Sequence, residues 1–304
     1  LLGSEYRILE EGLCGRTTCL DDPFNEGLSG LTYLLPCLQT HSPIDMLVIM
    51  LGTNDCKQRF SLTAANIALG MRRLVKKALE AEVWRDKPNI LVIAPGPILK
   101  ECELSDVGKN MGICSDKSYE IAKELLRSNK AKEAIVVNGF KNVDALSVSS
   151  LATKENLPIL LNDGNRLSKD IKNIVEDSNI KKMYIIGGRT SLPRRIEDNI
   201  KALDVEYERL AGEDRYETSS KIAKYAYENS DKVILASGEN SIDALAAGVL
   251  TKMEKAPMLL VQKRRIPKSI SNRIEESKAK KFLLIGGEKT ISDRVKDKVE
   301  GLLK

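Results

Sequence analysis

The sequence of 304 residues is poor in aromatic side chains and contains a single histidine and a single tryptophan. Its six cysteines all precede residue 115: Cys14, Cys19, Cys37, Cys56, Cys102 and Cys114. The remainder has neither histidine nor cysteine, which excludes a common metal site and any Ser-His or Cys-His pair there. No apolar run reaches the ~18 residues of a membrane span, and no signal peptide opens the chain. Because the chain begins Leu1-Leu2 without methionine, we expect a fragment. The missing targeting signal therefore says nothing about where the protein is located.

Charge divides at the same place as the cysteines. Residues 1–115 hold 12 Lys and Arg against 14 Asp and Glu, a balance of −2. The remaining 36 basic and 29 acidic residues give +7, in agreement with the total of +5. Scattered thiols suit a reducing, cytoplasmic compartment, or else are small buried hydrophobes. A basic tract without cysteine suits a cell surface that faces an anionic polymer, so the chain is expected to contain two unlike domains.

Within the second half of the sequence, several short segments recur 99 residues later; Pro158, for example, recurs as Pro257. The matching segments are Asn138–Leu146 with Ser237–Leu245, Pro158–Leu161 with Pro257–Leu260, and Ile185–Gly188 with Leu284–Gly287. Several anchors at one spacing indicate a duplicated structural unit. We expect two tandem units, at about 116–206 and 207–304.

Each unit is expected to alternate short apolar strands with helices, which is typical of parallel α/β layers. The expected strands are Ala134–Asn138, Ile159–Asn162 and Met183–Ile186, then Val233–Ser237, Met258–Gln262 and Phe282–Ile285. A helix should begin near Asp144 and another near Asp243, where a carboxylate favours the helix dipole. The glycine pairs that follow the third strand of each unit are interpreted as turns or as points of close ligand approach.

The first part of the chain also predicts a parallel sheet. Its expected strands are Tyr6–Leu9, Met46–Leu51, which should be buried on both faces, and Asn89–Ala94. A helix capped by Thr63 should lie between the last two, with its apolar face formed by Ile67, Met71, Leu74, Val75, Ala78 and Leu79. Active groups in such sheets follow the strand ends, and Glu11–Thr18 and Leu51–Asp55 lie there.

Those two segments resemble the SGNH (GDSL-type) ester hydrolases of the arylesterase-like branch, with further likeness at Asp21–Phe24, Gly30–Leu34 and Ala94-Pro95. The resemblance covers about Leu1 to Ile98 and implies a truncated, flavodoxin-like parallel sheet. It also implies that the Gly15 backbone N–H and the Asn54 side-chain amide would bind an oxyanion.

The residues that correspond to the family's nucleophile and general base are missing from this sequence. The family's nucleophile lies in a Gly-Asp-Ser turn, which we expect upstream of this chain; Ser4 precedes a strand instead. The family's base is a histidine three residues after an aspartate, whereas His41 precedes Asp45 and is interpreted as a loop residue. We therefore expect an oxyanion site without nucleophile or base, and an active hydrolase only if other parts supply them.

Between the repeats, Arg209–Thr218 leads into an expected helix over Ser219–Glu228. This string and the repeat anchors resemble the type 2 cell-wall-binding repeats of clostridial surface and S-layer proteins, over about Asp116 to Lys304. The resemblance implies units, commonly three to a chain, that hold proteins non-covalently to an anionic wall polymer. The first unit has Gly108–Lys117 where its opening motif should stand. The chain thus reads as a junction of residues 1–112 and 113–304, and an artificial fusion or mis-assembled gene without its own function stays an alternative.

Basic side chains are the candidates for polymer binding in the repeats: Arg189, Arg194, Arg195, Arg209, Arg215, Lys263, Arg264 and Arg265. Arginine forks bind phosphate or carboxylate with two hydrogen bonds. The alternatives are a solvated charged face and, for Arg215, a structural pair with Asp214. Nucleic acid is not expected, because +7 is modest and aromatics are few. We expect no metal, no cofactor and no membrane span, and leave homo-oligomers open.

Overall fold

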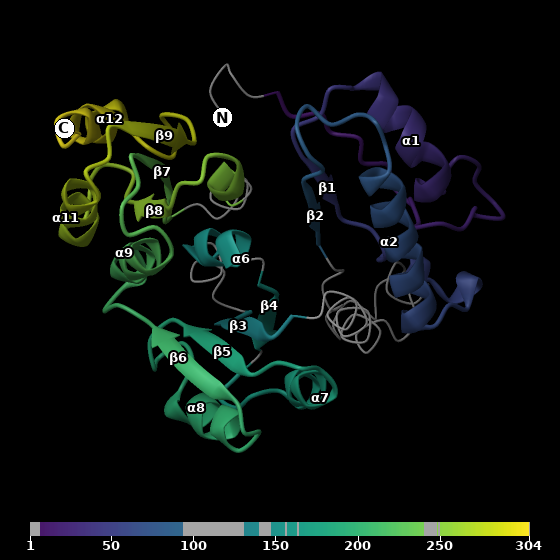
Figure 1. Ribbon diagram of the computed structural model, residues 1–304, viewed down its shortest axis with the longest axis horizontal. Coiled ribbons are helices and arrows are strands. Elements are labelled where there is room, and N and C mark those ends of the chain that lie inside the picture. The colour runs from purple at the N-terminus through teal and green to yellow at the C-terminus, as the bar shows by residue number, and fades with distance from the viewer. Residues whose placement is uncertain are drawn as a thin grey trace. The chain divides into compact units, whose positions relative to one another are not determined.

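The structure, a computed structural model, describes residues 7–93, 131–139, 147–155, 157–162, 164–239, 248 and 250–303 (Figure 1). Two compact units divide the chain: one contains residues 9–129, and the other contains residues 130–304 together with the first eight residues. Both are α/β, and every pairing between their strands is parallel, as the sequence predicts. None of the described helices is long and apolar enough to cross a membrane.

The first unit contains the predicted strand–helix–strand crossover. Its elements are α1 (Gly30–Thr40), β1 (Leu47–Ile49), the 3₁₀ turns η1 (Asn54–Cys56) and η2 (Gln58–Phe60), α2 (Ala64–Leu79) and β2 (Ile90–Val92). The hydroxyl of Thr63 accepts a hydrogen bond from the Asn66 N–H and so caps α2, as expected. The helix buries Ile67, Met71 and Leu74, whereas Leu79 at its last turn is half exposed, contrary to the prediction.

Two strand predictions for this unit are wrong. Residues 7–9 form no strand, and Ile8 and Leu9 are exposed. The strand β1 is not buried on both faces, since Val48 is 45% and Met50 is 65% exposed. Helices α1 and α2 pack on the same face, where Ile49, Met71 and Leu74 meet Leu31 and Leu34. Among the described residues of this unit no element covers the opposite face, where Val48 is exposed.

The first repeat is a four-stranded sheet. Its elements are β3 (Glu133–Asn138), α6 (Ser149–Glu155), β4 (Ile159–Asn162), α7 (Lys169–Asp177), β5 (Lys182–Ile186), α8 (Arg194–Lys201) and β6 (Glu206–Leu210), with strand order β4-β3-β5-β6. Strand β6 was not predicted, because its sequence contributes only Tyr207 and Leu210 as apolar side chains. It pairs with β5, and the sheet of the first repeat therefore extends beyond the expected boundary at residue 206.

The second repeat reproduces the first with one strand fewer among the described residues. Its elements are α9 (Arg215–Ala226), β7 (Lys232–Ser237), β8 (Met258–Val261), α11 (Lys268–Ser277), β9 (Lys281–Ile285) and α12 (Asp293–Glu300), with order β8-β7-β9. Ile135 lies opposite Ile159 in the first sheet, and Ile234 lies opposite Met258 in the second. The register is thus repeated 99 residues later, which confirms the duplication and the six expected strands. The helix starts expected at Asp144 and Asp243 lie outside the described residues.

Helix α9 joins the two repeats. Its residues Ile222 and Ala226 belong to the core over β3 and β5, whereas Tyr216 and Ala223 pack in the core of β7 and β8. It begins at Arg215 rather than at the predicted Ser219, because the carboxylate of Asp214 accepts hydrogen bonds from the N–H groups of Tyr216 and Glu217. It ends at Ala226, two residues before the predicted end.

Candidate functional site

Two loops meet beyond the carboxyl ends of β8 and β9 in the second repeat. The loop after β8 turns tightly, since the Gln262 N–H donates to the Arg265 carbonyl over 3.1 Å. The loop after β9 opens with Gly286, whose φ of 127° lies in the left-handed region that glycine adopts readily. The Ser292 N–H donates to the Lys263 carbonyl over 2.9 Å and ties the two loops together. Ligands of parallel α/β sheets commonly bind at this edge.

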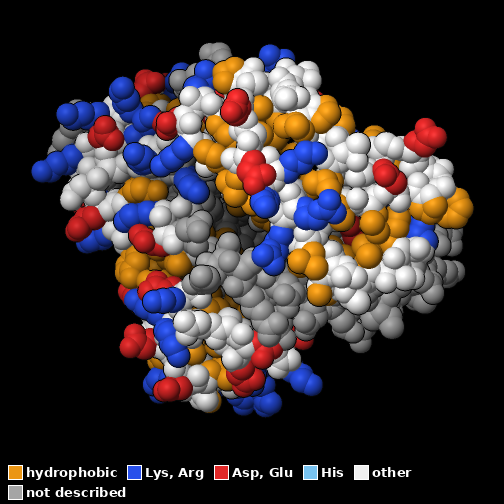
Figure 2. All heavy atoms as spheres, turned by 45° about the vertical axis from the view of Figure 1, so that its right-hand side comes forward, with side chains coloured by type: hydrophobic (Ala, Val, Ile, Leu, Met, Phe, Trp, Pro, Cys, Tyr) orange, Lys and Arg blue, Asp and Glu red, His pale blue; other side chains and the backbone are white. Residues whose placement is uncertain are grey.

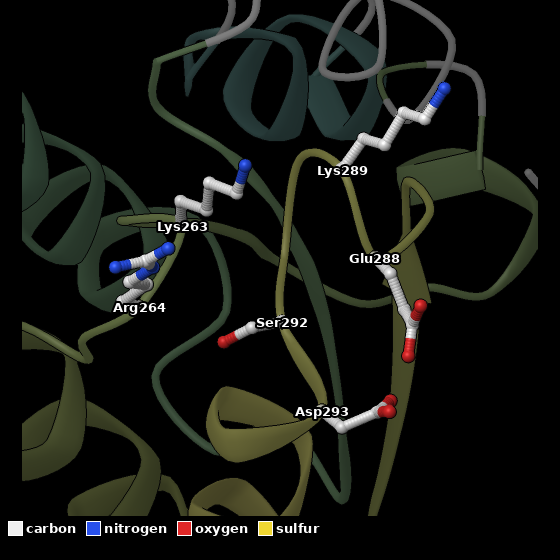
Figure 3. A pocket seen from close by; sticks show the side chains of 6 residues that line it. All are labelled: Lys263, Arg264, Glu288, Lys289, Ser292 and Asp293. Atoms are coloured by element: carbon white, nitrogen blue, oxygen red, sulfur yellow. The ribbon is translucent and has the colours of Figure 1, made fainter.

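A cavity of about 340 Å³ opens between these loops and is lined by Lys263, Arg264, Glu288, Lys289, Ser292 and Asp293 (Figure 3). Lys263 and Arg264 lie on one side of it, and the carboxylates of Glu288 and Asp293 point toward one another on the other. Within the described part of the chain, Lys263, Arg264 and Lys289 form no ion pair. Their charges are therefore available to a ligand.

Ser292 supplies an unpaired polar atom to this cavity. It is the N-cap of α12, but its hydroxyl makes no capping hydrogen bond. The Ser292 oxygen is buried and has no hydrogen-bond partner in the described structure. A buried polar atom without a partner costs about 1–3 kcal/mol, so a ligand that bonded to this hydroxyl would recover that loss.

The two carboxyl groups modify the charge of the cavity. A hydrogen bond with Asp293 raises the pKa of Glu288, and the charge of Asp293 raises it further. Carboxyl groups so close retain a shared proton more readily than isolated ones. The cavity therefore contains charges of both signs, since this pair lies beside Lys263, Arg264 and Lys289.

The same edge of the first repeat has a different charge pattern. Counting 99 residues back, Arg189 stands at the position of Glu288, Arg194 at that of Asp293, and Pro193 at that of Ser292. The Arg189 side chain is 66% exposed and lies 4.0 Å from Glu197. Arg194 and Arg195 are exposed at the start of α8. The first edge is therefore basic and lacks counterparts of the Glu288–Asp293 pair and of Ser292.

Arg209 and Arg215 are held by the fold's own hydrogen bonds. Arg209 donates to the Glu197 carboxylate over 2.6 Å, to the Gly187 carbonyl over 2.7 Å and to the Leu192 carbonyl over 3.0 Å. Its side chain is only 15% exposed. Arg215 donates to the Gly238 carbonyl over 2.7 Å and forms no ion pair with Asp214. The structure places both arginines in the frame of the repeats and outside the cavity.

In the first unit, the loops of Gly15 and Asn54 lie side by side. The Asn54 amide donates to the Arg16 carbonyl over 3.1 Å, and Gly15 has a φ of 88°. Buried Asp55 accepts from the Thr18 N–H over 3.0 and 2.9 Å and from its hydroxyl over 2.5 Å, which joins the two loops. Burial raises the pKa of Asp55, and the bonds from Thr18 oppose that rise. The oxyanion-binding role of Gly15 and Asn54 stays a prediction.

His41 follows the end of α1, the 11-residue helix that begins at Gly30. Its ring nitrogen lies 2.7 Å from the Glu11 carboxylate. The other oxygen of that carboxylate accepts a hydrogen bond from the Tyr33 hydroxyl. His41 is thus engaged by Glu11, whereas the Asn54 amide donates to the Arg16 carbonyl.

Sequence reasoning missed Glu288, Lys289, Ser292 and Asp293 as cavity residues and did not group Glu11 and Cys37 with His41. The glycine pair after β9 was a usable signal for the cavity, because it marks a loop at a strand end. For the second group the signal was the four-residue spacing of Cys37 and His41 on one helix.

Comparison with known proteins gives a match for both repeats. A family model described as "Cell wall binding domain 2 (CWB2)" matches residues 115–197 and 209–296. The N-acetylmuramoyl-L-alanine amidase LytC of Bacillus subtilis (strain 168) is 27% identical over 182 residues, 60% of this chain and 36% of LytC. The structure of Cwp6 from Clostridium difficile superposes with a TM-score of 0.57 and 26% identity, over 61% of this chain and 30% of Cwp6. The chain thus spans about a third of the length of either relative.

A solved aryl esterase from M. smegmatis also matches, with 30% sequence identity over 53% of this chain and 69% of that chain. The TM-score of this match is 0.36, which is too low to support an argument from common structure. The hydrolase-like first part therefore rests on the residues named above.

Proposed function

The chain belongs to the cell wall binding domain 2 family, and we propose that its two repeats bind an anionic cell-wall polymer without forming a covalent bond. The observation that carries the proposal is the cavity of the second repeat, in which Lys263 and Arg264 face the unpaired hydroxyl of Ser292. The proposal places the repeats at the cell surface. The names of the family and of the amidase relative support a wall partner, and the charge of the cavity supports an anionic one.

The chemistry of the cavity fits a phosphate or carboxylate group of the polymer. The guanidinium of Arg264 offers two parallel N–H donors, and the ammonium groups of Lys263 and Lys289 add charge. The first backbone N–H groups of α12 carry partial positive charge at the same place. Together these groups suit an anion.

The first repeat would supply a second, weaker contact. Arg189, Arg194 and Arg195 occupy the corresponding edge but are more exposed and have no unpaired hydroxyl beside them. A repeating polymer that engages both edges would gain from their linkage in one chain. We therefore propose that the second repeat contributes most of the affinity and the first extends the contact.

The test is retention on purified cell walls of the double variant Lys263→Gln/Arg264→Gln. Its matched control is Lys280→Gln/Lys281→Gln, which removes equal charge from the opposite end of β9, where a cavity of about 400 Å³ lies. Because exposed charge contacts contribute up to ~1 kcal/mol each, the first variant should bind about fivefold or more weakly while the control binds normally. Retention of the unaltered protein should fall as salt rises, since the Debye length is only ~8 Å at physiological ionic strength.

Walls stripped of their anionic polymer serve as the second control. Equal pelleting on stripped and intact walls, or salt-independent pelleting, would overturn the proposal and leave a structural hybrid. Equal loss in both double variants would mean that net charge rather than the cavity binds the wall. Replacing Arg194 and Arg195 with glutamine should have a smaller effect than replacing the cavity pair.

An ester hydrolase is the second candidate, for the first unit alone. The observation that favours it is the contact between the Asn54 amide and the loop of Gly15. Against it stands the engagement of His41, the single histidine of the sequence, by the Glu11 carboxylate rather than by a nucleophile. We propose that this unit, as it stands, performs no ester hydrolysis.

A further inference from the structure

Three potential metal ligands gather at the C-terminal end of α1. Cys37 and His41 are four residues apart and therefore lie on one face of the helix, one turn from each other. Glu11 reaches them from the preceding loop. The sulfur of Cys37, a ring nitrogen of His41 and a carboxylate oxygen of Glu11 all lie within 4.8 Å of one another. Cys37 and His41 are half-buried, and the Glu11 side chain is 38% exposed.

The Glu11 carboxylate is oriented from two sides. One of its oxygens lies 2.7 Å from the His41 ring nitrogen, and the Tyr33 hydroxyl donates to the other. The Arg16 guanidinium stacks on the Tyr33 ring, 3.7 Å from its centroid. A ligand carboxylate held from behind by a hydroxyl is the arrangement that metal sites use to fix their ligands.

We propose that Glu11, Cys37 and His41 bind one Zn²⁺ ion, with the fourth coordination position taken by water. Thiolate, imidazole and carboxylate are the three side-chain ligands that Zn²⁺ accepts, and three protein ligands with one open position is a common zinc arrangement. Softer and harder ions fit less well: Mg²⁺ and Ca²⁺ prefer oxygen ligands, and a thiolate beside an imidazole favours zinc.

The geometry requires a small closing movement. Zinc bonds of about 2.0–2.3 Å place the ligand atoms of a tetrahedral site roughly 3.3–3.8 Å apart. The ligand atoms here are separated by 2.7 Å between Glu11 and His41 and by at most 4.8 Å overall. Changes of about 1 Å, within the reach of side-chain rotation, would complete the site. The hydrogen bond between Glu11 and His41 would be exchanged for two bonds to the ion.

The charges balance in the bound state. The Cys37 thiol gives up its proton to solvent, and thiolate and carboxylate together neutralise the 2+ charge of the ion. The positive charge of Arg16 lies nearby, with its guanidinium on the face of the Tyr33 ring, and opposes a cation at this place. The two negative ligands outweigh this single positive charge.

The experiment is a titration of the reduced, metal-free full chain with Zn²⁺. Calorimetry measures the binding, and the metal content is measured after dialysis. One equivalent should bind, and Zn²⁺ should raise the thermal midpoint of unfolding. Cys37→Ser and His41→Gln should each weaken binding at least about 100-fold, because even outer contacts of zinc ligands contribute about 10–100-fold. Tyr33→Phe, which removes an outer contact of the Glu11 ligand, should weaken zinc binding by about 10–100-fold. Cys14→Ser, which removes an exposed thiol outside the group, is the matched control.

Co²⁺ provides a separate readout of the ligands. A thiolate-to-cobalt absorption band should appear with the unaltered protein and with Cys14→Ser, and it should be absent with Cys37→Ser. Far-ultraviolet circular dichroism of each variant establishes that it is folded, so that a lost site is distinguished from a lost fold. Zinc binding that survives Cys37→Ser, stoichiometry far from one, or an equal loss in Cys14→Ser would overturn the proposal.

Discussion

The two parts of the chain bury their strands differently. In the repeats, β3, β7 and β8 are closed on both faces, and Val136, Ile234 and Leu259 have no exposed surface. In the described part of the first unit, α1 and α2 pack on one face of a two-stranded sheet, and Val48 and Met50 of the strand region stay exposed. Parallel strands are ordinarily covered on both sides, and β3, β7 and β8 follow this rule. The edge strand β4 of the first repeat, with Ile159 and Leu161 partly exposed, resembles β1 instead.

That difference extends to chemistry. The second repeat has a group of cations beyond its strand ends, at Lys263, Arg264 and Lys289, and charged residues also lie on strands, as Lys182 and Glu208 do. Figure 2 shows many Lys and Arg side chains on the visible face of the second repeat, at the left. The first unit instead carries the thiols and the histidine. Each part has a buried carboxylate, Asp55 in the first unit and Glu197 in the first repeat.

The largest expected effect concerns catalysis in the first unit. The full chain should hydrolyse short nitrophenyl esters no faster than buffer, because loss of a nucleophile–base unit typically costs about 10⁶ in turnover. The measurement is the initial rate with and without a serine-directed phosphonate. An ester hydrolysis rate that the phosphonate abolishes would show that the first unit is an enzyme and that the prediction is wrong.

The next effect separates framework arginines from ligand-binding ones. Arg209→Gln should lower the free energy of unfolding by about 3 kcal/mol, because Glu197 would be left buried without its partner. Arg264→Gln, at an exposed position, should change it by less than about 0.5 kcal/mol. Urea unfolding followed by far-ultraviolet circular dichroism measures both. If both substitutions changed the free energy of unfolding by the same small amount, Arg209 would have no structural role and would again be a candidate for polymer binding.

Two carboxylates that accept backbone N–H bonds allow a direct comparison of the two parts. Asp55→Ala should cost about 2–3 kcal/mol, because Asp55 is fully buried against Thr18. Asp214→Ala, at an exposed helix cap, should cost about 1 kcal/mol. Trp84, the single tryptophan, lies in the first unit, so its fluorescence reports unfolding there separately from the circular dichroism of the repeats.

The cost of Asp55→Ala should also depend on pH. Burial raises the pKa of Asp55 in the folded protein above the ordinary value of 3.8. The stability that this carboxyl contributes is therefore complete below the unfolded-state pKa and declines as the pH rises through the folded-state pKa. The substitution should cost more in acid than at neutral pH, and the opposite trend would mean that the bonds from Thr18 outweigh burial.

The smallest expected effect tests the open face itself. Val136→Ala in β3 should cost about 2 kcal/mol, since two fully buried methyl groups are removed. Val48→Ala in β1 should cost less than about 1 kcal/mol, because its side chain is 45% exposed. Urea unfolding by circular dichroism and Trp84 fluorescence distinguishes the two. Equal costs would indicate that the outer face of β1 is covered in solution.

Features that depend on neighbouring residues were predictable. The cap of Thr63 and the apolar face of α2 follow from helical spacing, and the strands of the repeats follow from short apolar runs present twice. Among the polymer candidates, Lys263 and Arg264 do line a cavity. Strand β6 has few apolar residues, so its sequence pattern is too weak to predict a strand. It forms because pairing with β5 supplies its backbone hydrogen bonds.

The sequence by itself determined that the chain contains a duplicated α/β unit with a 99-residue period, joined to an unlike first part with all the thiols. Only the tertiary structure decided which charged groups are free. It enclosed Arg209 with Glu197, left Ser292 unpaired beside Lys263, and brought Glu11 to Cys37 and His41. The physical reason is that secondary structure responds to the spacing of neighbouring residues, whereas hydrogen bonds and ion pairs join residues that meet only after the chain has packed.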